Sequence, residues 1–164
     1  MPEKQTIKKA RQLKREGKSP STQAGEFVRE EIHHVREGKH GARSPEQAIA
    51  IGLSKARRAG VNLRPPKKGT TSASTRRSAQ SALRAGRSKK KPSSSRSQAT
   101  RSALRREGHR AASGSALSRQ ASSAARRRGH RNLSAAAQKA VRTKGRTGRV
   151  AAARKAARTR ARRQ

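Results

Sequence analysis

Several residue types that build disulfides and stacking surfaces are missing from this sequence. It contains no cysteine, no tryptophan and no tyrosine, and it has one phenylalanine. The lack of cysteine excludes disulfides and thiolate metal sites and fits a reducing compartment. The lack of aromatic side chains argues against folds that stack single-stranded bases or RNA on aromatic platforms.

Long apolar segments are missing as well. No apolar run approaches the roughly 20 residues that span a bilayer. The N-terminal stretch also lacks the apolar core of a secretory signal. We therefore expect a soluble, cytoplasmic protein with no membrane partner.

Acidic residues are scarce relative to basic ones. The 164 residues include 8 Asp and Glu against 45 Lys and Arg, which gives a formal net charge of +37. Self-repulsion of that size opposes compaction, so we expect a polyanionic partner. Since duplex DNA carries one phosphate per about 1.7 Å of axis, these charges would match on the order of 60 Å of duplex.

The charge is unevenly distributed along the chain. Residues 1–64 hold 15 basic and 7 acidic residues, whereas residues 65–164 hold 30 basic residues and 1 acidic residue. This asymmetry predicts a short helical head over residues 1–64 and a basic tail. Within the tail we expect a Pro/Ser/Lys-rich linker over residues 65–96 and a repeat-like DNA-binding segment over residues 97–164.

The head contains three helical patterns, so the predicted fold class is mostly α with a small three-helix N-terminal head. The first pattern runs from Glu3 to Glu16, and the second begins near Ser21 or Thr22 and ends at Gly38. The third runs from Ser44 to Gly60, where Ser44 can cap the helix, Pro45 suits its first position and Gln47 completes a capping box.

The tail has few large apolar residues. Only six large aliphatic side chains occur after residue 64, and their burial could not offset the entropy of ordering about 100 residues. The tail is therefore predicted to be disordered or transiently helical. Its last stretch, residues 147–164, is rich in Ala and Arg, and we expect it to be coil when free and helical on phosphates. A tail that stays disordered while bound is the alternative.

One pattern recurs along the chain: a serine, a short Ala/Leu element, basic residues and a glycine. Copies begin at Ser54, Ser81, Ser102 and Ser123, and the segment REGKH at residues 36–40 is echoed by REGHR at residues 106–110. These units would present clusters of cations at intervals. Chance alignment in a chain of such biased composition is the alternative.

Other chemistry finds little support. Glu30 and His34, four residues apart, with Glu31 and His33 beside them, could suggest a metal site, but no further ligand is apparent. A charge-balanced, exposed helix face is the simpler interpretation. Nucleophilic catalysis needs a positioned base in a dry pocket. We therefore expect no metal, no cofactor, no catalytic residue and no enzymatic activity.

The block EEIHHVREGKHGARSPEQAIAIGLSKARRAG, from Glu30 to Gly60, resembles a family of small basic bacterial proteins of unknown function. The resemblance covers about residues 20–66 and implies no particular activity. The tail resembles the Ala/Lys/Arg tails of bacterial histone-like and linker-histone-like proteins. Together these resemblances imply a bacterial protein of the cytoplasm, associated with the nucleoid.

The predicted function is therefore charge-driven binding of duplex DNA with little sequence preference, with compaction of DNA as its consequence. An RNA- or ribosome-associated role is the alternative, and a homo-oligomer formed through the head stays open. A membrane-active role is disfavoured because the tail's apolar residues are mostly alanine. The predicted nucleic-acid contacts are Lys55, Arg57, Arg58, Arg105, Arg106, Arg126, Arg127, Arg128, Arg142, Lys144, Arg146, Arg149, Arg154, Lys155, Arg158, Arg160, Arg162 and Arg163.

Overall fold

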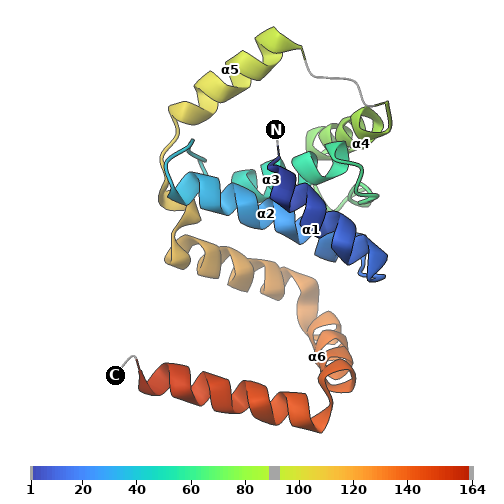
Figure 1. The fold of residues 1–164 in the computed structure, drawn as a ribbon, viewed down its shortest axis with the longest axis vertical. Helices are drawn as coiled ribbons and strands as arrows, with labels where there is room; N and C mark the ends of the chain where they lie inside the picture. The colour runs from blue at the N-terminus through green and yellow to red at the C-terminus, as the bar shows by residue number, and fades with distance from the viewer. Residues whose placement is uncertain (1, 89–92, 163–164) are drawn as a thin grey trace. The chain divides into compact units, whose positions relative to one another are not determined.

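The computed structural model describes residues 2–88 and 93–162. Within them the chain forms six α-helices, one 3₁₀ turn and no strand (Figure 1), which confirms the predicted mostly helical class. The chain divides into two compact units, Met1–Gln120 and Ala121–Gln164. In chain order the elements are α1 (Lys4–Arg15), α2 (Pro20–Arg36), α3 (Pro45–Arg58), α4 (Ala73–Ser88), α5 (Ser94–Arg105), the 3₁₀ turn η1 (Arg110–Ala112) and α6 (Gly114–Ala161).

Helices α1, α2 and α3 form where the sequence predicts them, and serine caps fix two of their starts. The Ser44 hydroxyl accepts a hydrogen bond from the Gln47 backbone N–H at 3.2 Å. The Gln47 side chain reaches one residue further back than an ordinary capping box and accepts from the Arg43 N–H at 2.7 Å. Helix α2 begins slightly earlier than expected because Ser19 is its cap, with Pro20 at its first position.

The first hydrophobic core lies where α1, α2 and α3 meet. Phe27, the chain's one aromatic residue, is 1% exposed and packs there. Helices α2 and α3 approach closely at Gly52, where a Cβ atom would lie 2.7 Å from the Val28 Cα. The other members of this core are small or half-buried: Ala10, Ala24, Ala56 and Val61, with Ile7, Leu53 and Leu63 against them.

A second core joins the α2–α3 region to residues from the predicted tail. Val35, Ala42 and Ala48 pack against Ala111 and Ala112 of η1, with Ile32 partly buried beside them. Backbone hydrogen bonds run from Gly41 N to Leu104 O (2.8 Å) and from Ala42 N to Gly108 O (2.9 Å). The residues that follow the first REG segment therefore bond to the backbone at and just before the second one.

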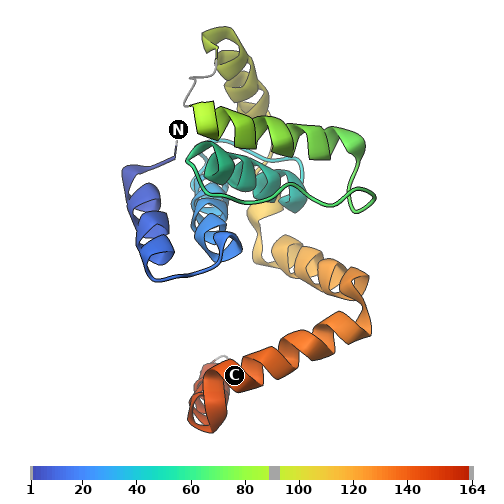
Figure 2. The same ribbon diagram turned by 90° about the vertical axis from the view of Figure 1, so that its right-hand side faces the viewer.

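Helix α4 packs along α3, as Figures 1 and 2 both show. Ala79 and Ala82 are its buried residues. At Gly86 the backbones come so close that a Cβ atom would lie 2.1 Å from the Arg57 carbonyl oxygen. The expectation of a three-helix head is therefore wrong, because α4 and η1 complete the first compact unit. Within the predicted linker, residues 73–88 are helical rather than irregular.

The prediction of a disordered tail is also wrong for the described residues, which form α4, α5 and α6. Alanine, leucine and arginine have high intrinsic helix propensity, and serines supply N-caps for the tail helices. Ser93 accepts from the Arg96 N–H at 3.4 Å, and Ser113 accepts from the Ala116 N–H at 3.2 Å. Local propensity and capping thus order segments that lack large aliphatic residues.

Helix α6 is interrupted at two glycines. Gly129 has φ 76° and Gly145 has φ 62°, so neither is helical, and the element consists of three successive helical segments. Glycine adopts this left-handed region without the steric cost that a Cβ atom brings. Gly60, which follows α3, also has a positive φ (91°). Gly86 lies inside α4 instead, so the glycines of the recurring pattern do not all end a helix.

Candidate nucleic-acid interface

The basic residues of α6 are exposed on every side of the helix. From Gly114 to Ala161 the sequence has 14 Lys and Arg and no Asp or Glu, and no residue of α6 is buried. Because the helix has no apolar face to bury, its cations are not confined to one stripe. A polyanion approaching from any direction would meet Lys or Arg side chains.

Five cations of α6 lie just before its two interruptions. Arg126, Arg127 and Arg128 precede Gly129, and Arg142 and Lys144 precede Gly145. The predicted contacts placed on α6 and its C-terminal end are all exposed as far as they are described: Arg126, Arg127, Arg128, Arg142, Lys144, Arg146, Arg149, Arg154, Lys155, Arg158, Arg160 and Arg162. Arg163 lies outside the described residues.

Arg105 and Arg106 lie at the C-terminal end of α5. Both side chains are exposed, and Arg106 is the C-cap residue. The carbonyl groups at a helix C-terminus carry partial negative charge, which favours cations there. These two arginines are therefore available to a partner, although the loop that follows them is held against the head.

Two of the three predicted head contacts have structural partners. Arg57 is 6% exposed and donates from Nε to the Leu63 carbonyl oxygen at 3.1 Å. Burial lowers the pKa of Arg57 from its ordinary value. Lys55 is an ion-pair partner of Glu31, a fully buried carboxylate. Arg58 alone of the three is exposed. The head therefore offers less of the predicted contact surface than its sequence suggests.

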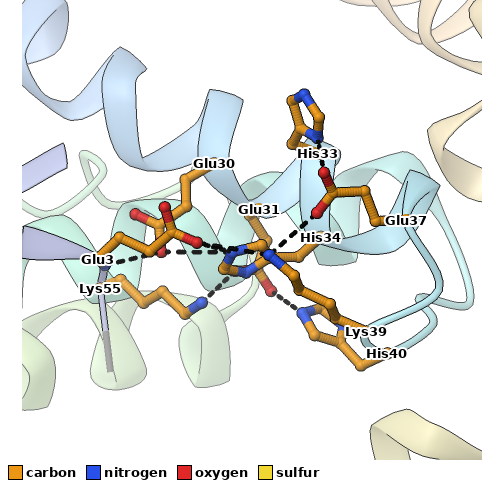
Figure 3. A network of polar contacts seen from close by, with 9 residues as sticks. All are labelled: Glu3, Glu30, Glu31, His33, His34, Glu37, Lys39, His40 and Lys55. Carbon is orange, nitrogen blue, oxygen red and sulfur yellow. Dashed lines mark hydrogen bonds and ion pairs between the residues drawn. The ribbon is translucent and has the colours of Figure 1, made fainter. Parts of the chain in front are cut away.

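A network of carboxylates and imidazoles occupies the head beside these residues (Figure 3). Glu31 on α2 lies with Oε1 3.1 Å from Nε2 of His40 and with Oε2 against the Lys55 ammonium. Neither Glu31 oxygen has a well-aligned hydrogen-bond donor, so charge rather than hydrogen-bond geometry compensates its burial. Glu30 is 7% exposed and Glu31 0%. The expected exposed, charge-balanced helix face is therefore wrong for both residues.

The start of α1 supplies further partners to this network. Nε2 of His34 lies 2.9 Å from Oε1 of Glu3. This hydrogen bond, with a smaller contribution from Lys39, lowers the pKa of the Glu3 carboxyl. Lys39 in turn lies 3.0 Å from Oε2 of Glu37, which raises the pKa of Lys39 and lowers that of Glu37.

Comparison with known proteins identifies no relative of this chain. No family model, curated protein or solved structure matches the chain. Function must therefore be argued from the residues themselves.

No helix in the described part of the chain is both long and apolar enough to cross a membrane.

Sequence reasoning missed Glu3 and His40 as members of the polar network. Glu3 is 27 residues from Glu30, and its backbone N–H nevertheless donates to Oε1 of Glu30 at 3.1 Å. His40 lies in the loop after α2 and reaches back to Glu31. The one available signal was local: half of the chain's 8 acidic residues and three of its 5 histidines fall at residue 3 and in residues 30–40.

Proposed function

We propose that this protein binds duplex DNA through its phosphates, with little sequence preference, and that α6 is its principal contact region. The observation that carries the proposal is the dense, exposed positive charge of α6, which has 14 Lys and Arg and no acidic residue. Phosphate contacts by Lys and Arg release condensed counterions and dominate non-specific affinity.

Phosphate contacts, rather than base readout, suit the composition of this region. No Phe, Tyr or Trp occurs after Phe27, so α6 lacks the large aromatic side chains on which single-stranded bases usually stack. Arginine and lysine on all sides of a helix can contact backbone phosphates without a defined register. This favours duplex DNA over single strands and favours binding over catalysis.

The interruptions at Gly129 and Gly145 support a role in compaction. Together they divide α6 into three helical segments of about 15 residues, each roughly 22 Å long. Separate segments can engage separate phosphate tracks, so one chain would bridge two duplexes and draw them together. On the resemblance of residues 20–66 and of the tail to bacterial proteins, we place this activity in the nucleoid.

The proposal is tested by competition between equal lengths of duplex DNA and structured RNA for the full chain, at matched salt. Duplex DNA should bind as tightly as RNA or more tightly, with little difference between DNA sequences. A clear preference for RNA at every salt concentration would replace this proposal with an RNA- or ribosome-associated role.

A further inference from the structure

A cleft in the head opens between the start of α1 and one face of α2. Its volume is about 340 Å³, and Glu3, Glu30, His34, Glu37 and Lys39 are among its lining residues. Glu30 and His34 lie four residues apart on α2, so both project from the same face of the helix. Glu3, the N-cap residue of α1, lies against them from the other side (Figure 3).

The polar atoms in this cleft are spaced as ligands around one metal ion would be. Nε2 of His34 lies 2.9 Å from Oε1 of Glu3 and 3.9 Å from Oε1 of Glu30. Two ligands bound tetrahedrally to Zn²⁺ at about 2.0–2.1 Å are about 3.3 Å apart. All three ligand atoms lie within 4.8 Å of one another. Small side-chain adjustments would therefore bring them to bonding distance.

Glu30 also has an oxygen that the protein leaves without a partner. Its side chain is 4% exposed, and its Oε2 atom is buried with no hydrogen-bond partner. A buried carboxylate oxygen without a donor is costly unless a cation compensates it. A metal ion bound through Oε1, the oxygen nearer His34, would supply positive charge to the same carboxylate.

The local charge favours a cation despite the strongly positive chain. Four carboxylates line the cleft (Glu3, Glu26, Glu30 and Glu37) against three cations (Lys9, Arg29 and Lys39), and Lys9 and Arg29 are both paired with Glu26. The ammonium of Lys39, whose side chain is 53% exposed, lies 3.5 Å from Oε1 of Glu3. Lys39 can leave Glu3 for solvent and keep its contact with Glu37 when another cation arrives.

A second group of three, formed by Glu31, His34 and His40, fits a metal less well. Its ligand atoms also lie within 4.8 Å of one another. However, Glu31 is fully buried and already paired with Lys55, so a dication would have to displace an ammonium from a closed site. His40 is likewise already in contact with Glu31, at 3.1 Å.

We propose that Glu3, Glu30 and His34 bind a divalent transition-metal cation of the Zn²⁺ class, with water completing the coordination. One imidazole with two carboxylates suits such ions, whereas Mg²⁺ and Ca²⁺ prefer oxygen ligands alone. The bound ion would tie the first residues of α1 to the middle of α2. This site is independent of the proposed DNA contacts on α6.

The test is titration of the full, DNA-free chain with Zn²⁺ by calorimetry and with Co²⁺ by visible absorption. We expect one strong site per chain and a higher melting temperature with Zn²⁺ than with a chelator. Glu3→Gln should weaken Zn²⁺ binding by at least about tenfold, since even outer-shell partners of a metal contribute about 10–100-fold. Glu3 is half exposed, so this variant should keep the fold, and circular dichroism checks that it does.

Two matched controls separate this site from adventitious binding. His130→Gln removes an exposed imidazole from α6, and Glu46→Gln removes an exposed carboxylate from the first turn of α3. Neither should change the affinity. The proposal is overturned if no strong Zn²⁺ site is found, or if a control variant loses as much Zn²⁺ affinity as Glu3→Gln. It is also overturned if Zn²⁺ binding survives Glu3→Gln and Glu30→Gln but disappears in His40→Gln.

Discussion

The buried carboxylate of Glu31 shows most clearly how single residues shape the head. It is 0% exposed, and it lies against the Lys55 ammonium from α3 and against the His40 imidazole from the loop between α2 and α3. A buried charge is tolerated only while its partners remain, so this residue makes the stability of the head depend on both. It also removes Lys55 from the cations that are free to meet DNA.

We predict that Lys55→Met destabilises the protein by about 3–5 kcal/mol, because it leaves the Glu31 carboxylate buried without its cation. The matched change Lys39→Met, at an exposed pair, should leave the unfolding midpoint nearly unchanged. Denaturant unfolding of the three proteins measures both effects.

The double variant Lys55→Met/Glu31→Leu separates the ion pair from any role of Lys55 in binding. It should recover most of the lost stability, because both charges are then gone. DNA affinity should stay within about twofold of the wild type, because the variant loses one positive and one negative charge and its net charge stays the same. A large loss of affinity in the folded double variant would restore Lys55 as a DNA contact.

At the residue scale, sequence predicts caps well and the direction of a side chain poorly. Ser44 and Pro45 start α3 as expected because capping is local chemistry. Arg57 and Arg58 are adjacent and chemically identical, yet one is buried on backbone carbonyls and the other is exposed. Only the path of residues 61–64, which supply those carbonyls, distinguishes them.

The elements of the tail illustrate a different limit. Counting large aliphatic residues predicts no packing after residue 64, but α4 packs on α3 through Ala79 and Ala82 and through the close approach at Gly86. Small residues let helices approach so closely that backbone atoms supply much of the contact. A count of large side chains does not register this kind of packing.

We predict that Gly86→Ala displaces α4 from α3, because the new Cβ would lie 2.1 Å from the Arg57 carbonyl oxygen. The cost should be about 1–3 kcal/mol. Tryptic cleavage at Arg76, Arg77 and Arg84 should become faster. Gly25→Ala is the matched control, since its Cβ would meet nothing within 4 Å. This substitution should stabilise α2 by up to about 1 kcal/mol, because alanine has the higher helix propensity. Equal cleavage rates in both variants would contradict the packing of α4.

At the scale of the whole molecule, the charge asymmetry of the sequence coincides with the division into two compact units. All 8 acidic residues lie in Met1–Gln120, and Ala121–Gln164 has 15 Lys and Arg and no acid. The sequence predicts this division of charge because it needs only composition. It places the end of the head at residue 64, however, whereas the compact unit continues to Gln120 through contacts separated by 60 residues or more, such as Gly41 with Leu104.

The central claim is that α6 and its C-terminal end make the phosphate contacts, and the salt dependence of duplex binding tests it most directly. One variant changes five exposed cations near the C-terminus to glutamine: Arg154, Lys155, Arg158, Arg160 and Arg162. The control variant changes five exposed cations of α1: Lys4, Lys8, Arg11, Lys14 and Arg15. Glutamine preserves helix propensity, and both variants lose the same charge.

The slope of log Kobs against log salt is negative, and each lost phosphate contact makes it less steep by about 0.9. The slope of the C-terminal variant should therefore be less steep than that of the wild type by several units, up to about 4.5. The slope of the α1 variant should change by less than about one unit. An equal fall in both variants, or a larger one in the α1 variant, would contradict the assignment of DNA binding to α6.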